Sequence, residues 1–229
     1  MPSIQTHTPH FNTRFAVLVA AAVAASLIAA TAVRTTLSLP SATAAAVQPL
    51  SLTQRVLPAT TLPGFVTPTP LNVVRSAQRW ARSTEQSATA ASEAARLDRL
   101  GFVSGIDETL HGRYPLAAEA ISLVERYRSA AGAQAELAHQ RQLILANTDG
   151  RKLTLVRSTG IPGAFAWSVT SHQMIGNNVA FTSGAYYYVV GSGAAPHVPG
   201  APTMHQILTA AQYVDLVANR CVAGPTAGR

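Results

Sequence analysis

The chain has 229 residues, of which 48% are hydrophobic and 12% are charged. This composition excludes a disordered polyampholyte and a coiled coil, and the length suits one domain with a tail. Its 17 basic and 10 acidic residues give a formal net charge of +7, and Lys152 is the only basic residue that is not arginine. Because the basic residues form no run, the sequence predicts no nucleic-acid partner.

The first element in chain order is an apolar segment from Phe15 to Val33, bounded by Arg14 and Arg34. As a helix it would be about 28 Å long, close to the roughly 30 Å thickness of the hydrocarbon core of a bilayer. The segment could therefore anchor the protein in the cell membrane if it is retained. A buried, alanine-rich core helix is a weaker interpretation, because the flanking segments are too polar to pack onto it.

A cleaved signal peptide is the competing interpretation of the same segment. Small-residue cleavage sites occur at Ala30-Thr31-Ala32 and Ala42-Thr43-Ala44. Both interpretations predict an extracytoplasmic domain, either anchored or secreted. The only cysteine is Cys221, so a lipoprotein anchor and an internal disulfide are excluded. We expect Cys221 to be a small buried hydrophobic residue, and an intermolecular disulfide stays open.

From Thr35 to Pro70 the chain is rich in Ser, Thr, Ala and Pro, which predicts an extended stalk. We therefore divide the chain into four parts. Residues 1–46 are an export signal or signal anchor with the start of the stalk, 47–56 a linker, 57–222 a single globular domain and 223–229 a disordered tail.

Within the domain, helical spacing predicts a helix from Ala88 to Leu100 that ends at Gly101. Two neighbouring strands, Phe102–Leu110 and Ala120–Tyr127, follow it. The next segment, Ser129–Leu145, has the pattern of an amphipathic helix with Ser129 as its N-cap.

After a predicted turn at 147–150 the hydrophobic period changes to two, which predicts strands around 153–155, 165–169 and 179–181. Ser183-Gly184 predicts a hairpin whose second strand is Ala185–Val190. Gly191–Pro202 is predicted as a loop, and Thr203 as the cap of a last amphipathic helix. This order predicts an α+β fold, a mostly antiparallel sheet covered by helices and preceded by an N-terminal apolar helix and a disordered stalk.

No pattern in the chain predicts catalysis, a metal or a cofactor. Two Glu-x-x-His pairs, Glu108/His111 and Glu136/His139, have a spacing used by carboxylate-bridged metal sites, but four long helices are absent from the pattern. Spacings typical of zinc, calcium, mononucleotide or nucleophile-elbow sites are also missing. We interpret the histidines that fall beside loops as solvated surface residues; they are His111, His172, His197 and His205.

An aromatic run offers the best candidate ligand surface. In a strand, Tyr186 and Tyr188 share one face and Tyr187 has the other. Plain packing explains these side chains, and the alternative is that Trp167 and Tyr187 contact a ligand. We keep Trp167 and Tyr187 as candidate ligand-binding residues.

Three stretches carry a resemblance: Leu62–Phe65, Glu93–Gly105 and Asn178–Gly191. In these stretches the chain resembles exported or membrane-anchored proteins of high-GC Gram-positive bacteria. The resemblance covers about residues 57 to 220. It implies secretion or anchoring and a small α/β sandwich of the PsbP-like or extracellular sensor-like kind. It implies no activity and no catalytic residues.

The sequence therefore predicts an exported, non-catalytic domain that binds an unidentified partner protein or small ligand. It contacts a membrane only through Phe15 to Val33, if that segment is uncleaved. Two alternatives stay open: an extracytoplasmic hydrolase that uses His172 or His111, and a structural envelope protein without a ligand.

Overall fold

The structure, a computed structural model, describes residues 50–67, 71–84, 89–113, 118–146 and 151–220. The predicted export segment, its two cleavage sites, Cys221 and the 223–229 tail lie outside these ranges. None of the described helices combines the length and the hydropathy that a membrane span requires.

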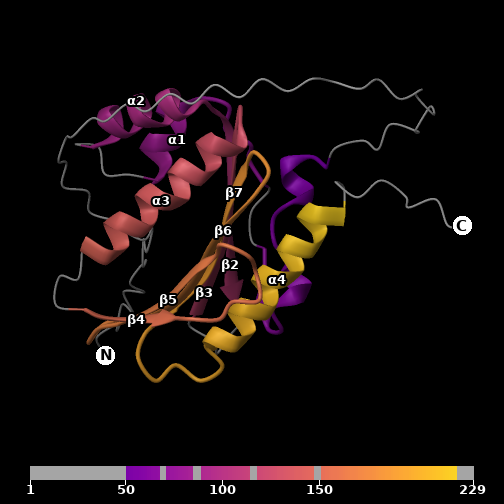
Figure 1. The fold of residues 1–229 in the computed structure, drawn as a ribbon. Coiled ribbons are helices and arrows are strands. Elements are labelled where there is room, and N and C mark those ends of the chain that lie inside the picture. The colour runs from indigo at the N-terminus through magenta and orange to yellow at the C-terminus, as the bar shows by residue number, and fades with distance from the viewer. Residues whose placement is uncertain (1–49, 68–70, 85–88, 114–117, 147–150, 221–229) are drawn as a thin grey trace, which may run out of the picture.

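A seven-stranded sheet organises the domain, in the order β1-β2-β3-β7-β6-β5-β4, with every neighbouring pair antiparallel. The strands are β1 (Phe65–Val66), β2 (Phe102–Gly112), β3 (Ala118–Tyr127), β4 (Lys152–Val156), β5 (Phe165–Thr170), β6 (Ile175–Ser183) and β7 (Tyr186–Ala194). They form two meanders, β1 to β3 and β4 to β7, which meet where β3 pairs with β7 (Figure 1). The predicted α+β class with an antiparallel sheet is confirmed.

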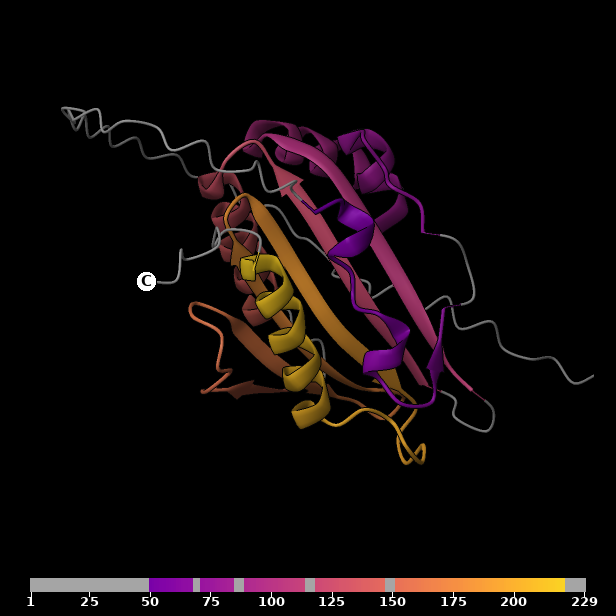
Figure 2. The same cartoon turned by 90° about the vertical axis from the view of Figure 1, so that its right-hand side faces the viewer.

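Helices cover both faces of this sheet. On one face lie α1 (Ala77–Thr84), α2 (Ala90–Leu100) and α3 (Ala130–Ala146) (Figure 1). The other face carries α4 (Met204–Arg220) and two 3-10 turns, Leu52–Gln54 and Ala59–Thr61 (Figure 2). The sheet therefore separates two hydrophobic cores.

The strand alternation assigns side chains to these cores as the sequence predicts. Tyr186 and Tyr188 pack with α4 and the N-terminal turns, whereas Tyr187 packs under α1 to α3. The predicted helix ends are also confirmed. Gly101 ends α2 with a φ of 80°, and Thr203 accepts a hydrogen bond at its Oγ1 from the N–H of Gln206, at 3.3 Å.

Strand β7 corrects the predicted loop at Gly191–Pro202, because it continues to Ala194. A Cβ at Gly191 would lie 2.3 Å from Oδ1 of the buried Asn178, which is opposite it on β6. Glycine here provides room for a neighbouring side chain, a role that the local sequence does not distinguish from a turn signal.

Helix α1 is not predicted by the sequence pattern. Only Ala77, Trp80 and Ala81 of its eight residues are buried. Two of these three are alanines, so the apolar pattern is too weak to stand out from the polar residues around it.

A close approach of α2 and α3 depends on Gly132. A Cβ at this position would lie 2.3 Å from the carbonyl oxygen of Leu100, at the end of α2. We expect Gly132→Ala to lower the free energy of unfolding by about 2 kcal/mol, because the helices must separate. At an unconstrained helix position the same change raises stability by up to about 1 kcal/mol. A lower midpoint of urea denaturation for Gly132→Ala would support the close contact of the two helices. A higher midpoint would contradict it.

Candidate functional site

A groove of about 680 Å³ lies between α1 and α2 and reaches the start of β2. We call it the α1–α2 groove. Its apolar wall is formed by alanines of α2, and its polar rim comes from the start of α1 and the end of β3. These residues are Ala91, Ala94 and Ala95 on the wall, and Arg75, Gln78 and Arg128 on the rim.

Local sequence explains why the groove forms. Ala91, Ala94, Ala95 and Asp98 are spaced so that they share one face of α2, and all four line the groove. Their short side chains leave space that larger residues would fill. On the opposite wall Ser76 begins α1, and its Oγ accepts the N–H of Arg79 at 3.4 Å.

The rim of the groove is positively charged. Arg75 and Arg128 are exposed, and neither forms an ion pair with an acid in the described ranges. The stem of Arg128 lies against Gly101, where a Cβ would be 3.4 Å from the Cβ of Arg128. Asp98 is the acidic residue of the lining. Two guanidinium groups and one carboxylate therefore face the groove.

The opposite face of α2 holds a buried ion cluster. Nη1 of Arg96 donates to Oε2 of Glu136 on α3 at 2.6 Å, and its Nε donates to Oε2 of Glu93 at 2.7 Å. Gln140 also donates to Glu136, at 2.8 Å. Burial lowers the pKa of Arg96, but its hydrogen bonds to Glu93 and the charge of Glu136 outweigh this effect, and the net pKa is raised. Arg96 thus stays charged and ties α2 to α3.

The carboxyl group of Glu125 on β3 is also buried, and it is hydrogen-bonded to one side chain of α1 and one of β3. Oε1 accepts a hydrogen bond from Nε1 of Trp80, and Oε2 accepts one from the hydroxyl of Tyr127, both at 2.6 Å. Burial, followed by repulsion from Glu136, raises the pKa of Glu125 to about 8, against the effect of both hydrogen bonds and of Arg96. Glu125 is therefore protonated at neutral pH.

The position of that proton follows from the donors. Trp80 only donates, so Oε1 of Glu125 must accept, and the proton of the neutral carboxyl group resides on Oε2. In that state Oε2 donates to the hydroxyl of Tyr127, which is the reverse of the hydrogen bond that the carboxylate accepts. A carboxyl group with a raised pKa is a common feature of general acids. Here both oxygens have protein partners and the side chain is buried, which makes Glu125 a structural residue.

The two predicted ligand residues lie on the same sheet face as this carboxyl group. Trp167 is 8% exposed and stacks on Phe165, with ring centroids 4.9 Å apart. Tyr187 is 4% exposed, and it is opposite Glu125 in the register of β3 and β7. Burial, then the charges of Glu136 and Glu125, raise the pKa of Tyr187. Neither residue lines the α1–α2 groove.

The remaining candidates do not assemble into a catalytic or metal site. Nδ1 of His111 lies 3.5 Å from Oε1 of Glu119 across β2 and β3. Glu108 is buried and accepts a hydrogen bond from Thr67 at 2.6 Å, and burial raises its pKa. In the described ranges no three His, Cys, Asp or Glu side chains are placed to hold a metal ion.

Histidine 139 has an unusual environment beside the ion cluster. Its Nε2 is buried and has no hydrogen-bond partner among the residues that the structure describes. Burial, followed by the positive charge of Arg96, lowers the pKa of His139. The neutral imidazole thus packs beside the cluster without joining it.

Comparison with known proteins gives a similarity of low strength to a solved structure. No family model matches the chain, and no curated protein matches it. Among solved structures it is similar to the extracellular domain of PknH from Mycobacterium tuberculosis, with 12% identity and a TM-score of 0.47. The match covers 74% of this chain and 97% of that domain. At this level the similarity establishes neither a common fold nor a common function.

Proposed function

We propose that the chain is an exported, non-catalytic domain that binds a small ligand or a partner protein outside the cytoplasm, through the α1–α2 groove. Export is supported by the apolar segment from Phe15 to Val33. The observation that carries the binding function is the groove itself, a hollow whose rim presents Arg75 and Arg128 without ion-pair partners in the described chain.

The environments of the acidic and histidine side chains support a non-catalytic domain. Glu125 has a pKa of about 8, but its two carboxyl oxygens are hydrogen-bonded to Trp80 and Tyr127 and its side chain is buried. His111 is paired with Glu119, and His172 lies in an exposed turn between β5 and β6. No described carboxylate is hydrogen-bonded to either histidine in the manner of a catalytic base and its orienting acid.

Trp167 and Tyr187 remain a predicted second contact surface. Because both side chains are buried under α3, a ligand would reach them only if that helix moved away from the sheet. The groove requires no such movement, which is why we place the binding site there.

Native mass spectrometry of the protein purified from its own host tests the binding function. We expect a bound mass on the wild type that Ala95→Trp removes, because Ala95 is exposed and lines the groove. Ala138→Trp is the matched control, since Ala138 is exposed on α3 and is not part of the groove lining. It should keep the bound mass.

Two results would reject the groove as the binding site. One is a wild-type protein that carries only its polypeptide mass; the other is a bound mass that both tryptophan variants retain. A bound mass lost on Trp167→Phe but kept by Ala95→Trp would move the site under α3.

A further inference from the structure

We propose that the α1–α2 groove binds a phosphate group, held between the guanidinium groups of Arg75 and Arg128. This inference rests on the proposed binding function and adds the chemical class of the ligand. Three observations support it: most basic side chains are exposed, five of them lie near the groove, and backbone N–H groups at the groove have no acceptor in the described chain.

Three of the eight described acidic side chains are buried, whereas nearly all of the described basic side chains are at the surface. Glu108, Glu125 and Glu136 are buried. Among the described basic side chains whose exposure is known, only Arg55 and Arg96 are withdrawn from solvent by burial or ion pairing. The surface of the described chain therefore carries more basic than acidic side chains, and it favours anionic partners.

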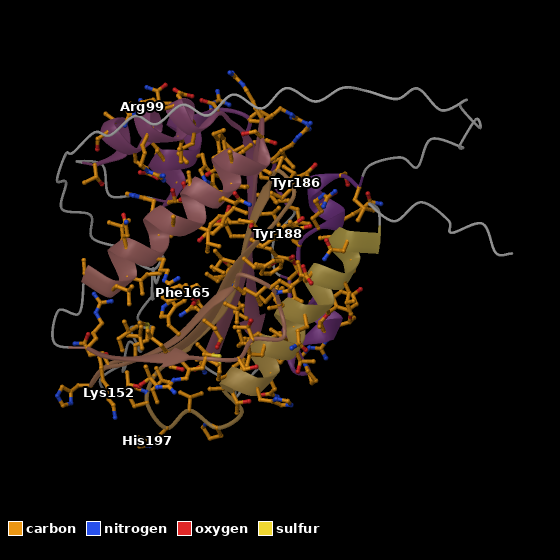
Figure 3. The ribbon with its side chains drawn as sticks, viewed as in Figure 1. Arg99, Lys152, Phe165, Tyr186, Tyr188 and His197 are labelled. Atoms are coloured by element: carbon orange, nitrogen blue, oxygen red, sulfur yellow. The ribbon has the colours of Figure 1, made fainter. Side chains whose placement is uncertain are left out.

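Five exposed arginines lie on α1 and α2 or in the residues next to α1 and β3, and we call them the arginine surface. They are Arg75, Arg79, Arg82, Arg99 and Arg128, all of them exposed. Arg79 and Arg82 are exposed residues of α1, on which Trp80 is buried, and Arg75 lies two residues before this helix begins. Figure 3 shows Arg99 on α2, far from Lys152 at the other end of the molecule.

The groove lies within this surface and presents further donors. Ser76 satisfies the N–H of Arg79, but within the described chain no acceptor is bonded to the N–H of Ala77 or Gln78. Free N–H groups at the start of a helix favour a negative charge. Together with two guanidinium forks they suit the oxygens of a phosphate, and the alanine wall lets such a group come close. Asp98 is the acidic residue of the lining, and the two arginines leave the groove with a net positive charge.

The multiplicity of arginines favours phosphate over a single carboxylate. A carboxylate presents two oxygens in one plane, whereas a phosphate group has four oxygens arranged tetrahedrally, at least two of them unesterified, and can accept from donors on several sides at once. A lipid headgroup and a soluble phosphate compound both offer this chemistry, so the test must separate the two sources.

The test measures binding of the full chain to three probes. These are phosphatidylglycerol vesicles, neutral phosphatidylcholine vesicles and inorganic pyrophosphate. We expect Arg75→Gln with Arg128→Gln to weaken binding of the phosphate probe about tenfold or more. Arg113→Gln with Arg157→Gln removes the same charge from exposed positions outside the groove, and this control should change binding by less than about twofold.

The outcomes decide both the ligand class and its source. Binding to phosphatidylglycerol but not pyrophosphate supports a lipid headgroup, and the neutral vesicles correct for insertion of an apolar segment. Binding to pyrophosphate supports a soluble ligand. Absence of binding to both probes, or an equal loss in the two double variants, overturns the proposal. If neither probe binds while Ala95→Trp still removes a native bound mass, the binding function holds and the phosphate assignment fails.

Discussion

Replacing Arg96 with methionine should lower the free energy of unfolding by about 3 kcal/mol or more. The guanidinium group is 15% exposed and its partner Glu136 is 1% exposed, so the variant leaves a buried carboxylate without its cation. Glu93 loses a hydrogen-bond partner as well. The change should appear as a lower midpoint in urea denaturation, with the slope unchanged.

The matched control is Arg99→Met, three residues further along α2. Arg99 is exposed and has no ion pair among the described residues, so this variant should stay within about 0.5 kcal/mol of the wild type. Adding Glu136→Gln to Arg96→Met should recover part of the loss, because the unpaired charge is removed. Equal stabilities of the two methionine variants would contradict a buried, energetically important ion pair.

The free energy of unfolding should fall as the pH rises from about 4.5 to about 8, because of Glu125. The folded protein holds a proton on this carboxyl group up to a pKa of about 8, whereas the unfolded chain releases it near 4.5. The stabilising contribution is therefore complete below about pH 4.5 and lost by about pH 8. The slope approaches about 1.4 kcal/mol per pH unit in between.

Glu125→Gln isolates this effect, since the amide mimics the protonated acid. Its oxygen can accept from Trp80, and its NH₂ group can donate to the hydroxyl of Tyr127. Wild type and variant should be about equally stable near pH 5, and the variant should be more stable by several kcal/mol at pH 8. His139, whose lowered pKa gives the opposite trend at low pH, is present in both and cancels. Parallel pH profiles would show that Glu125 ionises normally.

The elements that the sequence predicts well are those whose signals are local. Gly101 ends α2, Thr203 begins α4, and the alternation of Tyr186, Tyr187 and Tyr188 assigns three side chains to two cores. Each of these depends on residues within a few positions of one another. The signal of α1 is local too, but it is weak, because two of the three buried residues of this helix are alanines.

The groove and the ion cluster could not be predicted in the same way. Arg96 and Glu136 are 40 residues apart, and Trp80 and Glu125 are 45 apart. Of the two rim arginines, Arg75 precedes α1 and Arg128 follows β3, so α1, α2, β2 and β3 separate them in the chain. Glu136 and His139 have the Glu-x-x-His spacing of some metal sites, but the ion-pair partner of Glu136 is Arg96. No local pattern connects these two residues. Only the fold brings these charges together.

The pairing of β3 with β7 has a consequence for how the chain folds. Each meander can form from neighbouring strands, but this seam joins residues at least 60 positions apart, such as Arg126 and Tyr186. Loop-closure entropy delays contacts of this kind, so we expect the seam to close late. Until it does, β3 and β7 are both bare edges, and during that interval the nascent domain is most exposed to pairing with another chain.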